Sequence, residues 1–433
     1  MKKYLQFILK ILAKRVITRY HPTVIGVTGS VGKTTTKEAI YSVLSRKFRV
    51  RKSSLNFNNA IGTPISVLGI RPPKVKDECG FYHYDRLGFV GLAFDLLKAF
   101  YLAFGLRDKN YPKILLLELG ADKSGDISYL VEMVQPTIGV VTAVGEIPVH
   151  VEFYSSPKAV AKEKGMLVES LPSNGLAILN HDDQTVLDMK ERTKAKVVTI
   201  GFSPEATIWA SDVSYVVSDP PTGGENSIGG LSFKVHLGES FVPFRINKIV
   251  GIHQIYAILN AIAVGSHLGI NLVEMASIME SFEPPKDRMV LAHGIKNTII
   301  INDAYNASPP STHAALDTLR DFGDSVVALR GRGRRVAVLG DMKELGKYSV
   351  DAHQAIGGLI ADRADLLVTV GEHAKFIADS ASSSLSADKI FSFHDSAEAA
   401  PKVLELIEEG DIVLVKGSRS MRMERVLEEI VSK

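Results

Sequence analysis

The segment "VIGVTGSVGKTTTKEAI", Val24–Ile40, decides the fold class expected for this chain. An apolar strand runs into a glycine turn, and a lysine with three threonines then opens a helical pattern. Glycines let successive backbone N–H groups point at an anion, and the start of a helix adds a favourable dipole. The segment therefore predicts a phosphate loop, with a GxxGKT core that begins at Gly29.

The loop is expected to bind the phosphates of ATP between Gly29 and Thr35. Lys33 is placed to reach the β and γ phosphates, and the Thr34 hydroxyl to bind Mg²⁺. A glycine turn with a chance lysine is the alternative, but the strand before it and the helix after it argue against that reading. The remaining loop contacts predicted for the nucleotide are Gly29, Ser30, Val31, Gly32 and Thr35.

The rest of the chain alternates short β-rich runs such as "KILLLELG" and "TIGVVTAVG" with helical patterns, which is typical of a mainly parallel α/β sheet. Alternating apolar residues near 205–250 predict antiparallel strands attached to the same sheet. The run "FEPPKDRM", 282–289, stops this series, and a second α/β series follows. We expect a central P-loop ATPase-type domain at 23–285 and a C-terminal Rossmann-like α/β domain at 286–433.

The basic charge of the chain is concentrated at its start. The net charge is +3, but residues 1–22 hold six Lys or Arg and no acid, which leaves the rest at −3. A nucleic-acid binder would spread this charge over a folded face, so no nucleic-acid partner is expected. Residues 1–22 predict a basic amphipathic helix that either lies on an anionic membrane surface or packs on the body. Its apolar stripe is Leu5, Ile8, Leu9, Leu12 and Val16.

A second apolar segment, Leu87–Leu106, is interrupted only by Asp95 and Lys98. It predicts a buried helix, an interfacial helix or a partner groove, and together with residues 1–20 it suggests peripheral membrane contact. The single cysteine, Cys79, fits a reducing compartment, so we expect a cytoplasmic protein, with the inner face of the plasma membrane as a further option. No zinc-type spacing of Cys and His is present in the sequence.

Glu118 ends the strand "KILLLELG". A carboxylate at the carboxyl end of a parallel strand, beside a phosphate loop, is well placed as a hard oxygen ligand for Mg²⁺. A surface ion pair is the alternative role for this residue.

Several separate motifs resemble the Mur ligases, ATP-dependent enzymes that form amide bonds in cell-wall peptide assembly. The likeness runs from about Val24 to the C-terminus. It rests on "TGSVGKTTTKE", "NFNNAIGTP", "LELGADKSGDI", "HVEFYSSPKAVAKEKG", "GIHQIYAILNAIAVGSHLGI" and "VKGSRSMRME". "DAYNASPPS" and "VLGDMKELGKYSVDAH" are closest to the branch that adds D-alanyl-D-alanine.

The resemblance implies an ADP-forming ligase of peptidoglycan synthesis. ATP would convert a substrate carboxylate into an acyl phosphate, which an amine then attacks. The implied partners are a peptide-bearing cell-wall precursor and a D-alanyl-D-alanine-like amine. One Mg²⁺ would bind Thr34 and Glu118. A second would bind Lys164 after CO₂ has converted that lysine into a carbamate, with Lys162 as the neighbouring alternative.

The resemblance also assigns roles to residues outside the loop. His150 would contact metal or phosphate, and His253 the second metal or the nucleotide. Arg288 and Asp303 would contact the γ phosphate and the ribose, so that closure of the last domain completes the site. The residues implied on the substrate side are Asn58, Asn59, Tyr305 and Asn306.

The chain also departs from the family pattern. Only the basic helix precedes the phosphate loop, where the family usually has a domain that grips the UDP-sugar end of the substrate. This difference leaves three possibilities for the substrate. The remaining domains hold it, it is linked to a membrane, or the carboxylate donor is a different molecule. An extra stretch at 71–111 and the Gln254 and Ala257 positions, where the family has asparagines, are further differences. We expect a monomer.

Three alternative functions compete with the peptide ligase. A ligase of the same fold that acts on another carboxylate, of the folylpolyglutamate or amino-acid-polymer type, keeps the chemistry and changes the substrate. A non-catalytic scaffold with this fold would not need Lys33, Thr34, Glu118 and Lys164 all together. A P-loop kinase or GTPase would need guanine-reading or acceptor motifs that the sequence does not display.

Overall fold

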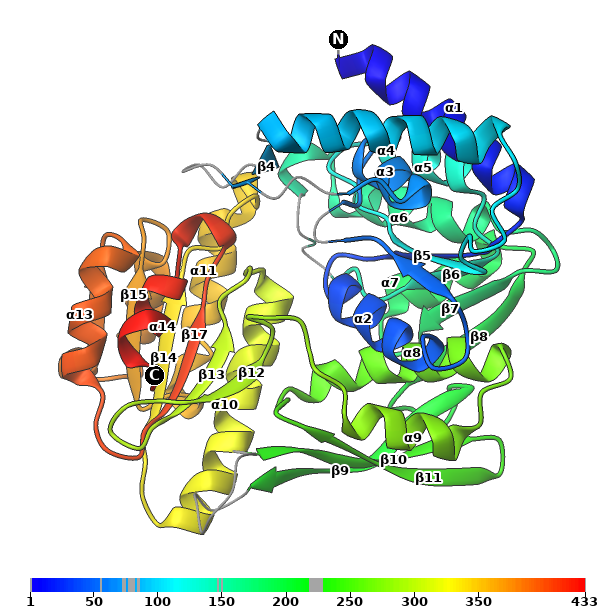
Figure 1. Ribbon diagram of the computed structural model, residues 1–433. Coiled ribbons are helices and arrows are strands. Elements are labelled where there is room, and N and C mark those ends of the chain that lie inside the picture. Colours follow the sequence, from blue (N-terminus) through cyan, green and yellow to red (C-terminus); the bar gives the residue numbers. More distant parts are fainter. Residues whose placement is uncertain are drawn as a thin grey trace.

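The protein folds around two β-sheets, each covered by helices on both faces (Figure 1). The computed structural model describes residues 2–54, 57–71, 75–76, 82–83, 86–145, 148, 151–217 and 229–432. Side chains at 2–3, 75–76, 82–83, 86–90 and 92 lie outside this description. The expected α/β fold class is confirmed.

The first sheet has nine strands in the order β11-β10-β9-β8-β7-β6-β1-β5-β2. All pairs from β2 to β9 are parallel, and β9, β10 and β11 pair antiparallel, as the sequence predicted. The strands are β1 (Thr23–Thr28), β2 (Val50–Lys52), β5 (Ile114–Glu118), β6 (Ile138–Val141), β7 (Leu176–Asn180), β8 (Lys196–Gly201), β9 (Ile208–Val217), β10 (Gly229–Leu237) and β11 (Ser240–Asn247). A separate antiparallel pair joins β3 (Val75–Lys76) and β4 (Tyr82–His83).

Successive residues of the inner strands of this sheet contribute to two different cores. Val24 of β1 packs with one cluster, while Ile25 and Val27 pack with the other. The first cluster lies under α1 (Lys2–Tyr20), α3 (Gly62–Leu68), α4 (Arg86–Phe104), α5 (Asp126–Val134) and α6 (Pro157–Glu169). The second lies under α2 (Lys33–Leu44), α8 (Ile255–His267) and α9 (Leu272–Glu280). Burial of both faces explains the nearly continuous apolar runs of these strands.

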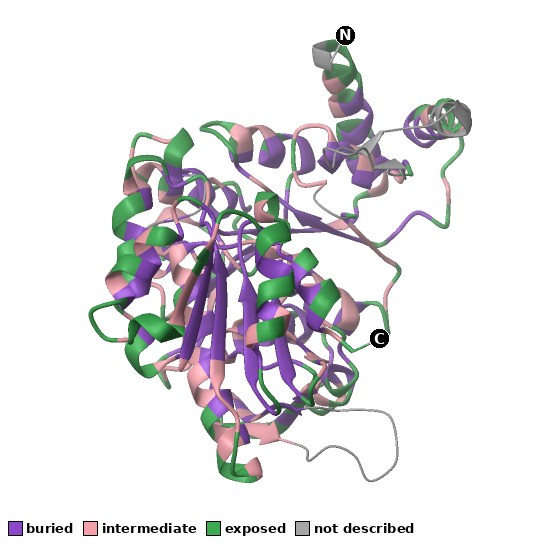
Figure 2. Cartoon of the chain, turned by 90° about the vertical axis from the view of Figure 1, so that its left-hand side faces the viewer, coloured by how far each residue is buried: buried purple, intermediate pink, exposed green. Residues whose placement is uncertain are grey.

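The helix α1 packs on the body along one face, through Leu9, Leu12, Ala13, Val16 and Ile17. Before Leu9, the large apolar side chains at 4, 5, 7 and 8 are exposed, and Figure 2 shows this end of the helix projecting from the body. The prediction that this helix packs on the body is therefore confirmed for its C-terminal part. The reading of Leu87–Leu106 as a fully buried helix is wrong, because α4 exposes large apolar side chains on its outer face.

The second sheet has the order β12-β13-β17-β14-β15-β16, with only β12 antiparallel. Its strands are β12 (Val290–His293), β13 (Ile299–Asp303), β14 (Arg335–Gly340), β15 (Leu366–Val370), β16 (Ile390–Phe393) and β17 (Ile412–Lys416). One face carries α10 (Pro309–Arg330), α11 (Ser349–Gly357) and α12 (Lys375–Ala381), and the other α13 (Ser396–Leu406) and α14 (Glu424–Ile430). We propose the domain boundary between residues 285 and 286, just before β12.

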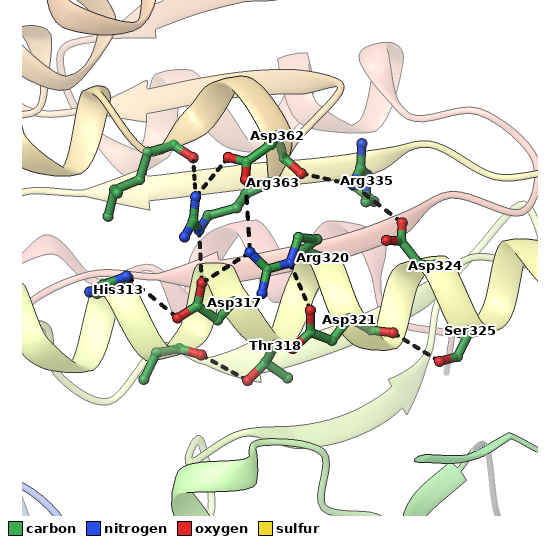
Figure 3. Close-up of polar contacts among 12 residues, drawn as sticks. His313, Asp317, Thr318, Arg320, Asp321, Asp324, Ser325, Arg335, Asp362 and Arg363 are labelled. Carbon is green, nitrogen blue, oxygen red and sulfur yellow. Dashed lines mark hydrogen bonds and ion pairs between the residues drawn. The ribbon is translucent and has the colours of Figure 1, made fainter. Parts of the chain in front are cut away.

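The helix α10 connects the two units. Phe322 is fully buried, and its ring lies 5.8 Å from that of Tyr215 on β9. On the other side of the helix, Arg363 donates to Asp317 over 2.8 Å within a wider network of ion pairs (Figure 3). Partly exposed ion pairs of this kind contribute modestly to stability, so the apolar contact of Phe322 should dominate. In the described part of the chain, no helix is long and apolar enough to cross a membrane.

Phe322→Ala should lower the free energy of unfolding by about 3–5 kcal/mol, because it leaves a cavity where α10 meets β9. Leu329→Ala, on the same helix but about half exposed, is the matched control and should change it by less than about 0.5 kcal/mol. Urea unfolding followed by circular dichroism measures both values. Equal losses in the two variants would contradict this account of the domain contact.

Candidate active site

The phosphate loop lies between β1 and α2, as predicted, and two glycines shape it. Gly29 has φ +146°, and a Cβ there would lie 2.0 Å from the Thr142 Oγ1. Gly32, with φ +83°, is the residue before the first turn of α2. Both positions need glycine because other residues rarely adopt positive φ. The loop is also tied to the 142–143 segment, since the Ser30 N–H donates to the Ala143 carbonyl over 2.6 Å.

Two lysine side chains converge on one carbonyl of this loop. Lys33 Nζ donates to the Gly29 carbonyl oxygen over 2.8 Å, and Lys164 Nζ donates to the same oxygen over 3.0 Å. Burial lowers the pKa of Lys33, although Glu118 opposes this shift. Burial and then the Lys33 charge lower the pKa of Lys164 to about 7. Lys162, the alternative two residues earlier, is exposed.

The loop also fits a phosphate group on chemical grounds. The Ser30 hydroxyl is buried and has no hydrogen-bond partner among the described residues. Two ammonium groups close to each other, one fully and one partly buried, likewise favour an anion between them. A nucleoside triphosphate tail supplies both the acceptor oxygens and the negative charge that this loop lacks.

Glu118 is the last residue of β5, next to the loop, and its carboxylate contacts three side chains. Its Oε2 accepts from the Thr34 hydroxyl over 3.2 Å, and its Oε1 accepts from the Asn58 Nδ2 over 3.2 Å. Lys37 Nζ, which is buried, lies 3.6 Å from Oε2. The Glu118 carboxylate and the Thr34 hydroxyl are a pair of hard oxygen ligands that would suit Mg²⁺. Among the described residues, no three His, Cys, Asp or Glu side chains cluster as a metal site.

The second sheet contributes a cationic group opposite the loop. Asp303 ends β13 and Lys416 ends β17, and the two are register partners joined by a 2.5 Å ion pair. Lys416 also donates to the Asn306 carbonyl over 3.0 Å. The Arg288 guanidinium lies 4.0 Å from the centre of the Tyr305 ring. Parallel strands place their carboxyl ends at one edge, which is why these residues meet.

Arg288 is held in an unusual stretch of backbone. Its neighbours Asp287 and Met289 have φ +61° and +54°, a conformation that non-glycine residues seldom adopt. The Asp287 carboxylate accepts from the Asn302 side chain over 2.9 Å, and its carbonyl accepts from the Tyr305 N–H over 3.2 Å. These bonds stabilise the strained turn and so fix the backbone position from which the Arg288 side chain extends.

His253 lies in a 3₁₀ turn, Ile252–Gln254, that leads into α8. Burial lowers its pKa to about 4, so the imidazole is neutral at physiological pH. A neutral imidazole can accept a hydrogen bond or bind a metal. Beyond it, the Tyr256 hydroxyl donates to Asp182 over 2.9 Å.

Most of these groups line one cavity of about 480 Å³ between the two sheets, whereas Gly29, Lys37, Lys164 and Asp182 do not. Lys164 contacts the loop from behind, and His150 lies outside the described residues. The predicted residues that line it are Ser30, Val31, Gly32, Lys33, Thr34, Thr35, Asn58, Asn59, Glu118, His253, Arg288, Asp303, Tyr305 and Asn306. A cavity of this size suits a nucleotide or a similar ligand.

The sequence did not reveal every group at the site. Lys416 and Lys37 were not singled out, although "IVLVKG" places Lys416 at the end of a buried strand, just as "ILLLE" places Glu118. The same reasoning about strand ends would have found it. Asn59 plays an additional local role, because its side-chain oxygen accepts from the Ile61 and Gly62 N–H groups at the start of α3.

Comparison with protein families gives two matches along the chain. The Mur ligase middle domain matches residues 27–76 and 100–265, and the Mur ligase glutamate ligase domain matches residues 287–419. The chain belongs to the Mur ligase family. Residues 77–99, within the predicted extra stretch, and those before 27 lie outside the matches.

Similar Mur ligases include two enzymes named UDP-N-acetylmuramoyl-tripeptide–D-alanyl-D-alanine ligase. The Bacillus subtilis enzyme is 28% identical over 424 residues, covering 98% of this chain and 79% of that one. The Mycobacterium tuberculosis enzyme is 29% identical over 427 residues, covering 95% and 73%. MurF from Acinetobacter baumannii has the same fold, with a TM-score of 0.76 at 24% identity, covering 98% of this chain and 80% of its own.

A MurF ligase from Thermotoga maritima, solved in complex with ADP, also shares the fold. Its TM-score is 0.75 at 24% identity, and the match covers 98% of this chain and 83% of that one. The two domain models confirm the family resemblance read from the sequence, and the similar enzymes named above belong to the branch that it indicated.

Lys164→Met should raise the melting temperature more at pH 6 than at pH 9 in bicarbonate-free buffer. The folded-state pKa of about 7 lies below the ordinary lysine value, so the unfolded chain binds more protons between the two values. The native protein therefore gains stability as pH rises above about 7, and a variant without this amine does not. Differential scanning calorimetry at both pH values measures the difference. A melting-temperature increment independent of pH would contradict the lowered pKa.

Proposed function

We propose that this Mur ligase joins D-alanyl-D-alanine to the carboxylate of a muramoyl-tripeptide precursor, forming ADP and phosphate from ATP. The observation that carries the proposal is the convergence of Lys33 and Lys164 on the Gly29 carbonyl, beside Glu118 and opposite Lys416. The relatives named for this reaction, and the related fold solved with ADP, support the choice of substrates and nucleotide.

The first step transfers the γ-phosphoryl group of ATP to the substrate carboxylate. Carboxylates are poor electrophiles, and the acyl phosphate turns the carbonyl into one that an amine can attack. Lys33 would leave the Gly29 carbonyl and bind the β and γ phosphates, while the loop N–H groups and Ser30 hold the remaining oxygens. Thr34 and Glu118 would bind one Mg²⁺, which when present neutralises part of the phosphate charge.

Lys164 would serve as a carbamate that binds a second Mg²⁺. Only an unprotonated amine adds to CO₂, and the pKa of about 7 gives Lys164 a large unprotonated fraction near neutrality. Carbamylation also replaces a buried cation with an anion, which relieves its repulsion with Lys33. His253, neutral at this pH, and His150 are the further proposed contacts of metal or nucleotide.

The second step is attack of the amine on the acyl phosphate, which expels phosphate. Arg288, Asp303 and Lys416 belong to the second sheet and face the loop across the cavity, so closure of this domain would shield the acyl phosphate from water. Asn58 and Asn59 would lie on the carboxylate side, and Tyr305 and Asn306 on the amine side. Because ATP is a cytoplasmic nucleotide, we place the enzyme in the cytoplasm, and we propose that it acts as a monomer.

Phosphate release from ATP should require both UDP-N-acetylmuramoyl-tripeptide and D-alanyl-D-alanine, measured by a coupled phosphate assay. Lys33→Ala should lower the rate by about 10²–10³ or more, because the phosphate charge loses its partner. Lys47→Ala, a surface lysine paired with Glu274, is the control and should retain full activity. Release that depends instead on a folate and glutamate would favour the alternative carboxylate. No release with either substrate set would favour a scaffold.

Lys164→Ala should lose most of its activity, and small carboxylic acids such as formate or acetate should restore part of it by replacing the carbamate. Lys162→Ala serves as the control, since this neighbouring lysine is exposed and its variant should behave like the unaltered enzyme. Initial rates with and without added acid measure the effect. Full activity in Lys164→Ala, or rescue confined to Lys162→Ala, would rule out the assignment.

A further inference from the structure

The helices α1 and α4 expose a set of large apolar side chains near the N-terminus of the chain. On α4 the exposed fractions lie between 50 and 70%, and on α1 between 41 and 77%. We call these side chains the apolar face. Its members are Tyr4, Leu5, Phe7, Ile8 and Ile11 on α1, and Phe94, Leu97, Phe100, Tyr101 and Phe104 on α4.

The outer side of α4 differs from that of an ordinary surface helix. Its inner side packs on the body through Ala99, Leu102 and Ala103, which are buried. Most exposed helix faces of soluble proteins are polar, whereas here the exposed residues at a helical spacing of three or four are aromatic or aliphatic. Contiguous exposed apolar surface of this kind marks a contact site.

The two helices meet at the C-terminal end of α4. The Arg15 guanidinium lies 5.7 Å from the centre of the Phe104 ring, and Arg19 donates to the Ala103 carbonyl over 3.2 Å. Residues 4, 8, 11 and 15 share one side of a helix, so this contact aligns the exposed stripe of α1 with the end of α4. Figure 1 shows both helices at the same end of the molecule, beyond α3 and α5.

Much of the apolar face lies outside the segments that the Mur ligase domain models match. The Mur ligase middle domain matches from residue 27 and leaves residues 77–99 unmatched. The first segment includes all of α1, and the second includes Phe94 and Leu97 of α4. The residues that line the cavity lie within the matched segments, and none of them belongs to the apolar face.

The charges beside this face are cationic. Lys14 and Arg15 of α1 and Lys98 of α4 are exposed, as are Arg107 and Lys109 just after α4. The single acid in the α4 sequence, Asp95, is turned inward and accepts from the Arg71 side chain over 3.0 Å. The exposed Glu132 on α5 is already paired with Lys10 at 2.9 Å.

This combination favours an anionic lipid surface over a second copy of the chain. Aromatic and aliphatic side chains enter the boundary between headgroups and acyl chains, while lysine and arginine contact anionic headgroups. Self-association about a two-fold axis would instead bring Arg15 and Lys98 against the same cations of the partner, which costs energy. We propose that the apolar face of α1 and α4 docks the enzyme on an anionic bilayer surface, with both helices lying along it.

Flotation with lipid vesicles tests this proposal on the full-length protein. The protein should float with vesicles of phosphatidylcholine and phosphatidylglycerol, and less with phosphatidylcholine alone. Added salt should weaken the binding, because it screens the exposed cations. Equal binding to both vesicle types, or none to either, would overturn the proposal.

Two sets of variants separate lipid binding from other causes. Phe94→Ser and Leu97→Ser should each weaken binding by roughly tenfold, since each removes apolar area that enters the bilayer. Phe241→Ser, on the remote strand β11 and also about half exposed, is the matched control and should bind as the unaltered protein does. Neither patch variant should alter soluble phosphate release or the melting temperature.

Sedimentation velocity without lipid tests whether a second copy of the chain, instead of a lipid surface, covers the apolar face. A single monomeric species for both the unaltered protein and Phe94→Ser supports the lipid surface. A dimer that Phe94→Ser dissociates would show that a second copy covers the face, and would overturn the proposal. This outcome is separate from the peptide ligase assignment, which depends on the cavity alone.

Discussion

The structure of the site depends on two lysines that share one backbone oxygen. Lys33 and Lys164 both donate to the Gly29 carbonyl, so two ammonium groups meet at one point, with Lys164 fully buried and Lys33 partly buried. Such an arrangement is unfavourable until negative charge arrives. Two further features of the loop also favour an anion. The Ser30 hydroxyl has no partner among the described residues, and the N–H groups at the start of α2 are available to donate to a negatively charged group. The electrostatic environment of the loop therefore favours phosphate before any ligand binds.

The strands of both sheets end at the same cavity, so residues from the second sheet face the phosphate loop of the first. Glu118 and the phosphate loop come from the first sheet, and Asp303 and Lys416 from the second. Neither unit presents a full set of groups for phosphoryl transfer and amine attack. The contact of Phe322 with Tyr215 joins α10 to the first unit, and ion pairs such as Asp317 with Arg363 fix α10 within the second unit. The site therefore depends on the relative position of the two units as much as on either sheet.

Much of the fold and of the site could be predicted from the sequence because both follow from local signals. The glycine turn, the strand that ends at Glu118 and the antiparallel strands near 205–250 were each read from composition and spacing. The strand-end position of Lys416 could have been read from "IVLVKG", but no local signal marks its pairing with Asp303, which lies over a hundred residues earlier. For α4, the pattern of apolar residues could not tell a buried helix from an exposed one, since burial depends on what lies beside it. His150 lies outside the described residues, so its role stays a prediction.

The strained turn around Arg288 limits the conformational freedom of its side chain. Asp287 and Met289 keep left-handed backbone angles that each cost on the order of 1–3 kcal/mol, and the surrounding hydrogen bonds offset this cost. A relaxed linker would let the guanidinium sample many directions, and every catalytic cycle would then include a search for the correct one. Here the folded backbone restricts that search before any ligand binds, which suits the phosphate contact proposed for Arg288.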